Sequence, residues 1–128
     1  MRKPLVYIAS PYTKGDQALN VRFQMEAFNS LLSDNVVLPI APLWSHFQHL
    51  AFPRLYEDWL SYDLELIDRC DILLRLTAVI PSMTYTQWES KGAKREEAHA
   101  RSRGIPVFHD IRLMYNFLET GPKRPPIL

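Results

Sequence analysis

Near its start the chain carries an apolar run, Pro4-Leu5-Val6-Tyr7-Ile8-Ala9, which stops at Ser10-Pro11-Tyr12. A short run of strand-forming residues that is closed by a proline turn is typical of a buried β-strand. A polar turn follows, and apolar residues then recur at helical spacing from position 16 to position 33. The first unit is therefore predicted to be a strand, a loop and a helix.

The same alternation continues along the chain. Further strands are predicted at 36–40, 71–76 and 105–108, and further helices at 53–68, 90–103 and 111–119. Gly104 is expected to end the helix that begins near residue 90. Two segments show no such pattern: residues 44–52 are predicted to be aromatic and irregular, and residues 77–88 to form a long polar and aromatic connection.

Strands that alternate with helices, each strand being a continuous apolar run, predict a parallel sheet covered on both faces. We therefore expect one Rossmann-like or flavodoxin-like α/β domain over residues 1–128, with four or five parallel strands flanked by helices. Such sheets bind ligands beyond the carboxyl ends of their strands, near a switch in strand order. The loops after the first three strands are expected to meet at that rim.

Composition limits the classes of protein that fit the chain. Its 128 residues suit one domain, and 47% hydrophobic and 23% charged residues are typical of a soluble globular protein. The net charge of +1 gives no overall attraction to a nucleic-acid polymer or a membrane, so any anion site has to be local. The glycine motifs of ATPases and dinucleotide-dependent oxidoreductases do not occur.

A lone cysteine and a short apolar amino terminus bear on the compartment. Cys70 has no partner for an internal disulfide, and its apolar neighbours predict a buried, reduced thiol. The apolar run before Ser10 is too brief for a signal peptide or a membrane span. We expect a cytoplasmic protein.

The start of the helix near residue 90 has the features of an anion site. Ser90 can cap the helix, Gly92 lets a ligand approach the backbone, and the free amides favour a phosphate. Glu96 would lie one turn further on, where it could meet the sugar of a bound nucleotide. Alternatively, Ser90 is only a cap, Gly92 only permits close packing, and Glu96 only complements the helix dipole.

Three segments follow one another in the order Tyr7-Ile8-Ala9-Ser10-Pro11-Tyr12, Asp63-Leu64-Glu65-Leu66-Ile67-Asp68-Arg69-Cys70-Asp71 and Ser90-x-Gly92-x-x-x-Glu96. Together they resemble the nucleoside 2-deoxyribosyltransferase superfamily. The nearest branch is that of the deoxynucleoside 5′-monophosphate N-glycosidases and their small phage or bacterial relatives, and the resemblance runs from about residue 6 to residue 107. It implies a hydrolase that cleaves an N-glycosidic bond and uses no cofactor and no metal.

The resemblance also implies roles for single residues. Glu96 matches the nucleophile that attacks the anomeric carbon, and Asp63 matches the carboxylate that holds the sugar and assists the departing base. The expected substrate-binding residues are Ser10, Pro11, Tyr12, His46, Ser90 and Gly92. Lys94, Arg95 and the long loop before Ser90 depart from the relatives, so the base and the 5′ group stay open.

The chemistry of the proposed reaction fits these residue types. An N-glycosidic bond breaks through an oxocarbenium-like state, and retaining glycosidases serve such a state with two carboxyls about 5 Å apart. Glu96 is preferred to its neighbour Glu97 because the small residues Gly92 and Ala100 lie on its helix stripe. Without the resemblance, Asp63 can equally be interpreted as an ordinary solvated residue of its helix.

Other polar and aromatic residues have weaker claims. His46 and His49 can share a helical face, but no cysteine or acidic residue lies at a fitting interval, so we expect no metal site. His46 is instead assigned to the lining of the substrate pocket. Aromatic side chains that could stack on a base, or else belong to the core, are Tyr12, Trp44, Tyr85 and Trp88.

Two further functions stay open at this point: base exchange between deoxynucleosides, and a catalytically idle domain that binds a nucleotide or signalling ligand. The expected partner is a small-molecule nucleotide or nucleoside. The resemblance also implies a homo-oligomer, a dimer or higher, because the family's pockets are often completed by a neighbouring subunit. The aromatic residues 44–52 are the segment expected at that interface.

Overall fold

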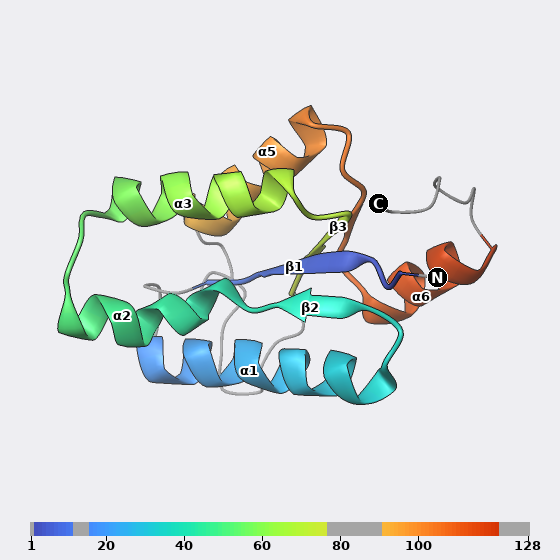
Figure 1. Cartoon of the computed structure of the whole chain (residues 1–128), viewed down its shortest axis with the longest axis horizontal. Helices are drawn as coiled ribbons and strands as arrows, with labels where there is room; N and C mark the ends of the chain where they lie inside the picture. The colour runs from blue at the N-terminus through green and yellow to red at the C-terminus, as the bar shows by residue number, and fades with distance from the viewer. Residues whose placement is uncertain (1, 12–15, 77–90, 121–128) are drawn as a thin grey trace.

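The computed structural model describes residues 2–11, 16–76 and 91–120, and Figure 1 shows how they are arranged. Four strands form one sheet in the order β2-β1-β3-β4, and all neighbouring strands are parallel. They are β1 (Leu5–Ala9), β2 (Leu38–Ile40), β3 (Ile72–Arg75) and β4 (Val107–Phe108). The predicted α/β fold with a parallel sheet is confirmed.

Helices cover both faces of this sheet (Figure 1). On one face lie α1 (Gln17–Asp34) and α6 (Ile111–Thr120), and on the other lie α3 (Tyr56–Asp68) and α5 (Lys91–Ser102). Between β2 and α3 the chain forms a 3₁₀ turn, η1 (Pro42–Trp44), and a short helix, α2 (Ser45–Ala51). None of the helices in the described ranges is both long and apolar enough to cross a membrane.

The pleat of β1 divides the core into two apolar clusters. Val6 and Ile8 face α1 and α6, whereas Tyr7 and Ala9 face α3 and α5. The first cluster also contains Leu31, Val37, Ile72, Leu74, Leu76 and Met114, and the second contains Ile67, Cys70, Leu73, Ala100 and Ile105. Tyr7 therefore brings a hydroxyl group into an otherwise apolar layer beneath α3 and α5.

Local signals fix the ends of the helices. The Asp16 side chain accepts a hydrogen bond from the Leu19 amide at 3.1 Å and so caps α1. After α5, Gly104 has a φ of 71°, a left-handed conformation that glycine adopts without strain. The expectation that Gly104 ends this helix is confirmed. Cys70 is buried, as predicted, and its thiol donates to the Leu66 carbonyl at 3.3 Å.

The prediction of an irregular segment over residues 44–52 is wrong, because most of it is the helix α2. Pro42 opens the preceding 3₁₀ turn with its fixed φ, and Trp44 packs edge-on against Phe28 of α1 with the ring centroids 4.7 Å apart. No side chain of α2 is fully buried, so the helix has no clean apolar stripe for the sequence to reveal.

β2 is also shorter than predicted, since only residues 38–40 pair with β1. It lies at the edge of the sheet, which is where a strand tolerates a proline such as Pro39.

Candidate active site

The strand order of the sheet reverses between its two central strands, β1 and β3. The chain runs from β1 outward to β2 and then returns to β3 on the other side of β1. Tyr7 pairs in register with Leu73, and Ala9 pairs with Arg75. Because side chains alternate along a strand, these four residues project toward the layer of α3 and α5. Tyr7 in the middle of β1 and Arg75 at the carboxyl end of β3 thus lie on one side of the sheet. Parallel sheets bind ligands beyond the carboxyl ends of their strands.

Glu96 of α5 is turned into this layer. It is 7% exposed and lies on the same helix stripe as Ala93 and Ala100, which are 1% and 0% exposed. The two alanines let α5 approach the sheet closely, and the fully buried Tyr7 donates its hydroxyl hydrogen to Glu96 Oε2. Sequence reasoning missed this role of Tyr7. The available signal was a hydroxyl in the middle of an aliphatic strand, where a buried polar group requires a partner.

Asp63 of α3 completes the cluster. Its side chain is half-buried and interacts with both Tyr7 and Glu96. Among the described residues, Asp63 Oδ1 is buried and has no hydrogen-bond partner. The structure therefore brings together the two carboxyls that the resemblance named as catalytic, although they come from different helices. A buried oxygen without a donor is costly, and it is a position where a ligand would supply the missing hydrogen bond.

Burial dominates the electrostatics of this pair. It raises the pKa of Glu96, and repulsion from Asp63 raises it further, while the Tyr7 hydroxyl and the charge of Arg75 lower it in part. Burial likewise raises the pKa of Asp63, with partial offsets from Tyr7 and Glu96. Burial and the two nearby acids hold the pKa of Tyr7 well above its usual range. Two such carboxyls retain a shared proton at pH values where exposed acids are fully ionised.

Glu97, the neighbour of Glu96, has a different environment. Its carboxylate accepts hydrogen bonds from Arg75 Nη1 and Arg101 Nε, each at 3.0 Å, and lies 3.0 Å from His109 Nε2. Burial raises its pKa, but these three partners outweigh burial and the net pKa is lowered. Of the two glutamates, only Glu96 faces Tyr7 and Asp63, so its assignment as the nucleophile stays the prediction that the geometry favours.

A buried glutamine, Gln24, binds the chain at the carboxyl end of β1. Gln24 of α1 donates to the Ile8 carbonyl at 3.1 Å and to Ser10 Oγ at 2.9 Å, and its oxygen accepts from the Leu43 amide at 2.9 Å. Ser10 is 7% exposed, and Pro11 is buried beside it. Sequence reasoning missed Gln24, whose signal was a polar residue on the apolar face of a helix. Tyr12, assigned to the same loop, lies outside the described residues.

The two histidines of α2 have separate environments. His49 Nδ1 accepts hydrogen bonds from Trp59 Nε1 at 2.8 Å and from the Arg54 amide at 3.2 Å, so it fixes the connection from α2 to α3. His46 is half-buried, with its ring 5.5 Å from that of Phe47. Nothing in the structure tests its assignment to a substrate pocket. Within the described ranges, no group of three acidic, histidine or cysteine side chains is arranged to hold a metal ion.

The predicted anion site at the start of α5 is only partly described. Gly92 is the second residue of α5 and is half-buried, whereas Ser90 lies outside the described residues, as do Tyr85 and Trp88. Phosphate binding at this helix end therefore stays a prediction.

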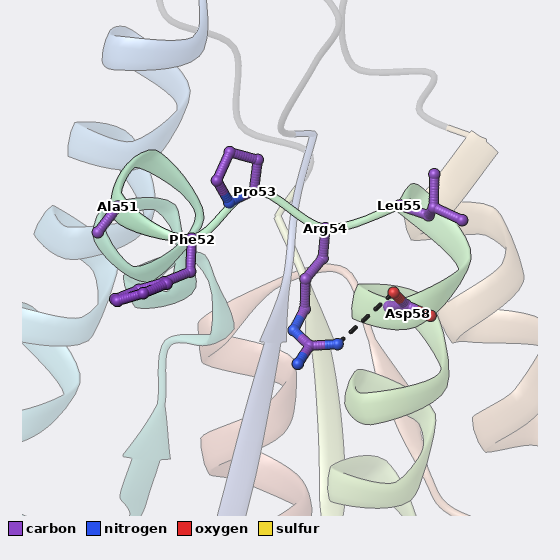
Figure 2. A pocket seen from close by; sticks show the side chains of 6 residues that line it. All are labelled: Ala51, Phe52, Pro53, Arg54, Leu55 and Asp58. Carbon is purple, nitrogen blue, oxygen red and sulfur yellow. Dashed lines mark ion pairs between the residues drawn. The ribbon is translucent and has the colours of Figure 1, made fainter.

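A surface groove of about 690 Å³ lies at the connection between α2 and α3. Figure 2 shows its lining, in which the Arg54 side chain extends toward Asp58, and their charged groups are 3.7 Å apart. The other lining residues are Ala51, Phe52, Pro53 and Leu55. The groove contains none of the predicted site residues.

The chain matches no protein-family model, and no curated protein matches it. Its function is therefore inferred from the geometry of the site.

Proposed function

We propose that this protein is a hydrolase that cleaves the N-glycosidic bond of a deoxynucleoside 5′-monophosphate, as members of the nucleoside 2-deoxyribosyltransferase superfamily do. The supporting observation is the cluster of Tyr7, Asp63 and Glu96. It places two carboxyls with raised pKa values against the central strand β1, on the side of the sheet that α3 and α5 cover. Pairs of this kind, which divide one proton between a nucleophile and an acid, are typical of glycoside-cleaving enzymes.

In the proposed reaction, the ionised Glu96 attacks the anomeric carbon while the bond from that carbon to the base nitrogen breaks. The bonding electrons leave with the base, which takes a proton from Asp63. Water then attacks the anomeric carbon of the glycosyl-Glu96 ester and gives its proton to Asp63, which releases the sugar phosphate and restores both groups. Tyr7 and Arg75 both favour the ionised form of Glu96.

The direct test is the release of free base from a panel of nucleotides and nucleosides, followed by chromatography. The proposal expects base release from at least one deoxynucleoside 5′-monophosphate, abolished by Glu96→Gln and retained in the matched variant Glu97→Gln. New nucleoside formed only when an acceptor base is added would show base exchange instead. Binding of a nucleotide without turnover would show the catalytically idle domain and overturn the proposal.

The preference for a 5′-phosphate needs its own test, because it depends on Ser90 and the backbone at Gly92. Charge-assisted hydrogen bonds are worth roughly 1.5–3 kcal/mol, so Ser90→Ala should lower kcat/KM for a monophosphate about tenfold or more. The kcat/KM for the matched nucleoside should hardly change. Equal losses on both substrates would show that Ser90 only caps α5.

We also propose a homo-oligomer that associates through α2 and the α2–α3 connection. Phe47, Leu50, Phe52 and Leu55 expose 62–75% of their surfaces there. The groove beside them holds both signs of charge, Arg54 and Asp58, so two copies related by a two-fold axis could exchange these partners. Light scattering should give a dimer or a larger assembly, and Phe52→Ser with Leu55→Ser should give a monomer. A monomeric parent protein would overturn this proposal.

A further inference from the structure

Arg75 is a half-buried cation at the end of β3, on the same side of the sheet as the acid cluster. Its side chain is 15% exposed, and the residue pairs in register with Ala9 of β1. Arg75 and Leu73 project toward α5, as do Tyr7 and Ala9. An arginine that is largely removed from water requires a partner, because desolvation of a charge is expensive.

That partner is Glu97 and not Glu96. The Arg75 guanidinium lies 3.0 Å from Glu97 Oε1, and within the described residues no ion pair joins Arg75 to Glu96. Successive residues of a helix point about 100° apart, so Glu96 faces Tyr7 while Glu97 faces Arg75. The guanidinium is thereby held near Glu96 without closing over its carboxylate.

The charge of Arg75 is not cancelled by this pairing. Glu97 is also bound by Arg101, whose Nη2 lies 2.9 Å from Glu97 Oε2, and it lies beside His109. One carboxylate thus faces two guanidiniums, which leaves the group with a net positive charge even when His109 is neutral. The groups that act on the charge of Glu96 are Tyr7 from β1 and Asp63 from α3, which face it, and Arg75 from β3, which acts through its charge.

We propose that Arg75, held in place by Glu97, is a positioning residue that keeps a fixed positive charge beside Glu96 and so favours the ionised form of this carboxyl, which is the form required for attack. The proposal rests on the proposed glycosidase function for its catalytic meaning. The effect of Arg75 on the pKa of Glu96 does not depend on that function. Glu97 has two tasks: it anchors the guanidinium, and it prevents a direct ion pair that would occupy the nucleophile.

The test is a carbon-13 NMR titration of the glutamate side-chain carboxyls, in which Glu96→Gln identifies the Glu96 signal. Arg75→Gln should raise the Glu96 midpoint by on the order of one pH unit, because a nearby cation favours the charged carboxylate. Glu97→Gln should lower the midpoint, since the released guanidinium can then turn to Glu96. Arg103→Gln is the matched control. This substitution removes an exposed arginine that is paired with Asp68, so the Glu96 midpoint should not change.

These measurements need no turnover, so they remain informative if the protein proves not to be a glycosidase. An unchanged Glu96 midpoint in Arg75→Gln overturns the proposal. If that variant fails to fold, Glu97→Gln decides by the sign of its shift, and an unchanged or raised midpoint then overturns it. If the protein is an active enzyme, the acidic limb of its profile of kcat against pH should move with the Glu96 titration midpoint in Arg75→Gln. In Arg75→Lys, which keeps the charge, this limb should stay close to that of the parent. A limb that does not move with the midpoint would overturn the catalytic part.

Discussion

Glu96 and Glu97 are adjacent in sequence, yet they occupy opposite electrostatic environments. Glu96 faces another acid, receives one hydroxyl hydrogen bond and has a raised pKa, whereas Glu97 is surrounded by three basic side chains and has a lowered pKa. A buried carboxylate without a cation partner costs stability, because nothing compensates the desolvation of its charge. This difference is the one expected if Glu96 is the reactive carboxyl of the proposed reaction and Glu97 supports it.

The strongest test of this contrast is the activity of two matched variants. Glu96→Gln should lower kcat by several orders of magnitude, because the amide keeps the shape but cannot bond to the anomeric carbon. Glu97→Gln should cost much less, about tenfold, since it acts only through Arg75. Both rates come from the base-release assay on the preferred nucleotide. The opposite ranking would exchange the roles of the two glutamates.

Asp63→Asn should have the second largest effect. General acid catalysis contributes about 10²–10⁴-fold, and the amide can still hold the sugar but cannot deliver a proton, so kcat should fall more than KM rises. A substrate whose base is a better leaving group should recover part of the loss. Normal turnover with only a lower melting temperature would show that Asp63 is structural.

Tyr7→Phe removes the hydroxyl that orients Glu96, and it should cost less than the loss of either carboxyl. A hydrogen bond to a charged group is worth roughly 1.5–3 kcal/mol, so kcat should fall about tenfold to a hundredfold. The acidic limb of the pH profile should move to higher pH, because the lost hydrogen bond had favoured the ionised carboxylate. A fall in kcat without that movement would contradict the proposed orientation of Glu96 by Tyr7.

The contrast between Glu96 and Glu97 was only partly predictable from the sequence. Helical periodicity placed Gly92 and Ala100 on the stripe of Glu96, and the structure buries Ala100 and adds Ala93, whereas Gly92 is half-buried. The partners of the two glutamates come from other elements. Tyr7 resembles any apolar strand residue, and Arg75 is set against Glu97 by the register of β3 with β1 and by the docking of α5. Periodicity reports which side of an element is buried, whereas strand register and helix docking determine which groups meet there.

The smallest expected effect concerns stability and also separates the two glutamates. A carboxyl whose pKa is raised by folding adds stability that is complete below its unfolded pKa, about 4.3, and is lost as the pH rises through the folded pKa. Glu96→Gln should therefore raise the free energy of unfolding at pH 8 by about 1–3 kcal/mol, with the gain shrinking toward pH 4.

Glu97 has a lowered pKa, so its ion pairs stabilise the fold above the unfolded pKa and are lost as the pH falls. Glu97→Gln should accordingly be less stable than the parent at pH 8 and approach it in acid. Urea unfolding of the three proteins at pH 4, 6 and 8 measures both trends. Losses of stability in both variants at pH 8 would mean that the site around Glu96 is an ordinary, well-compensated part of the fold.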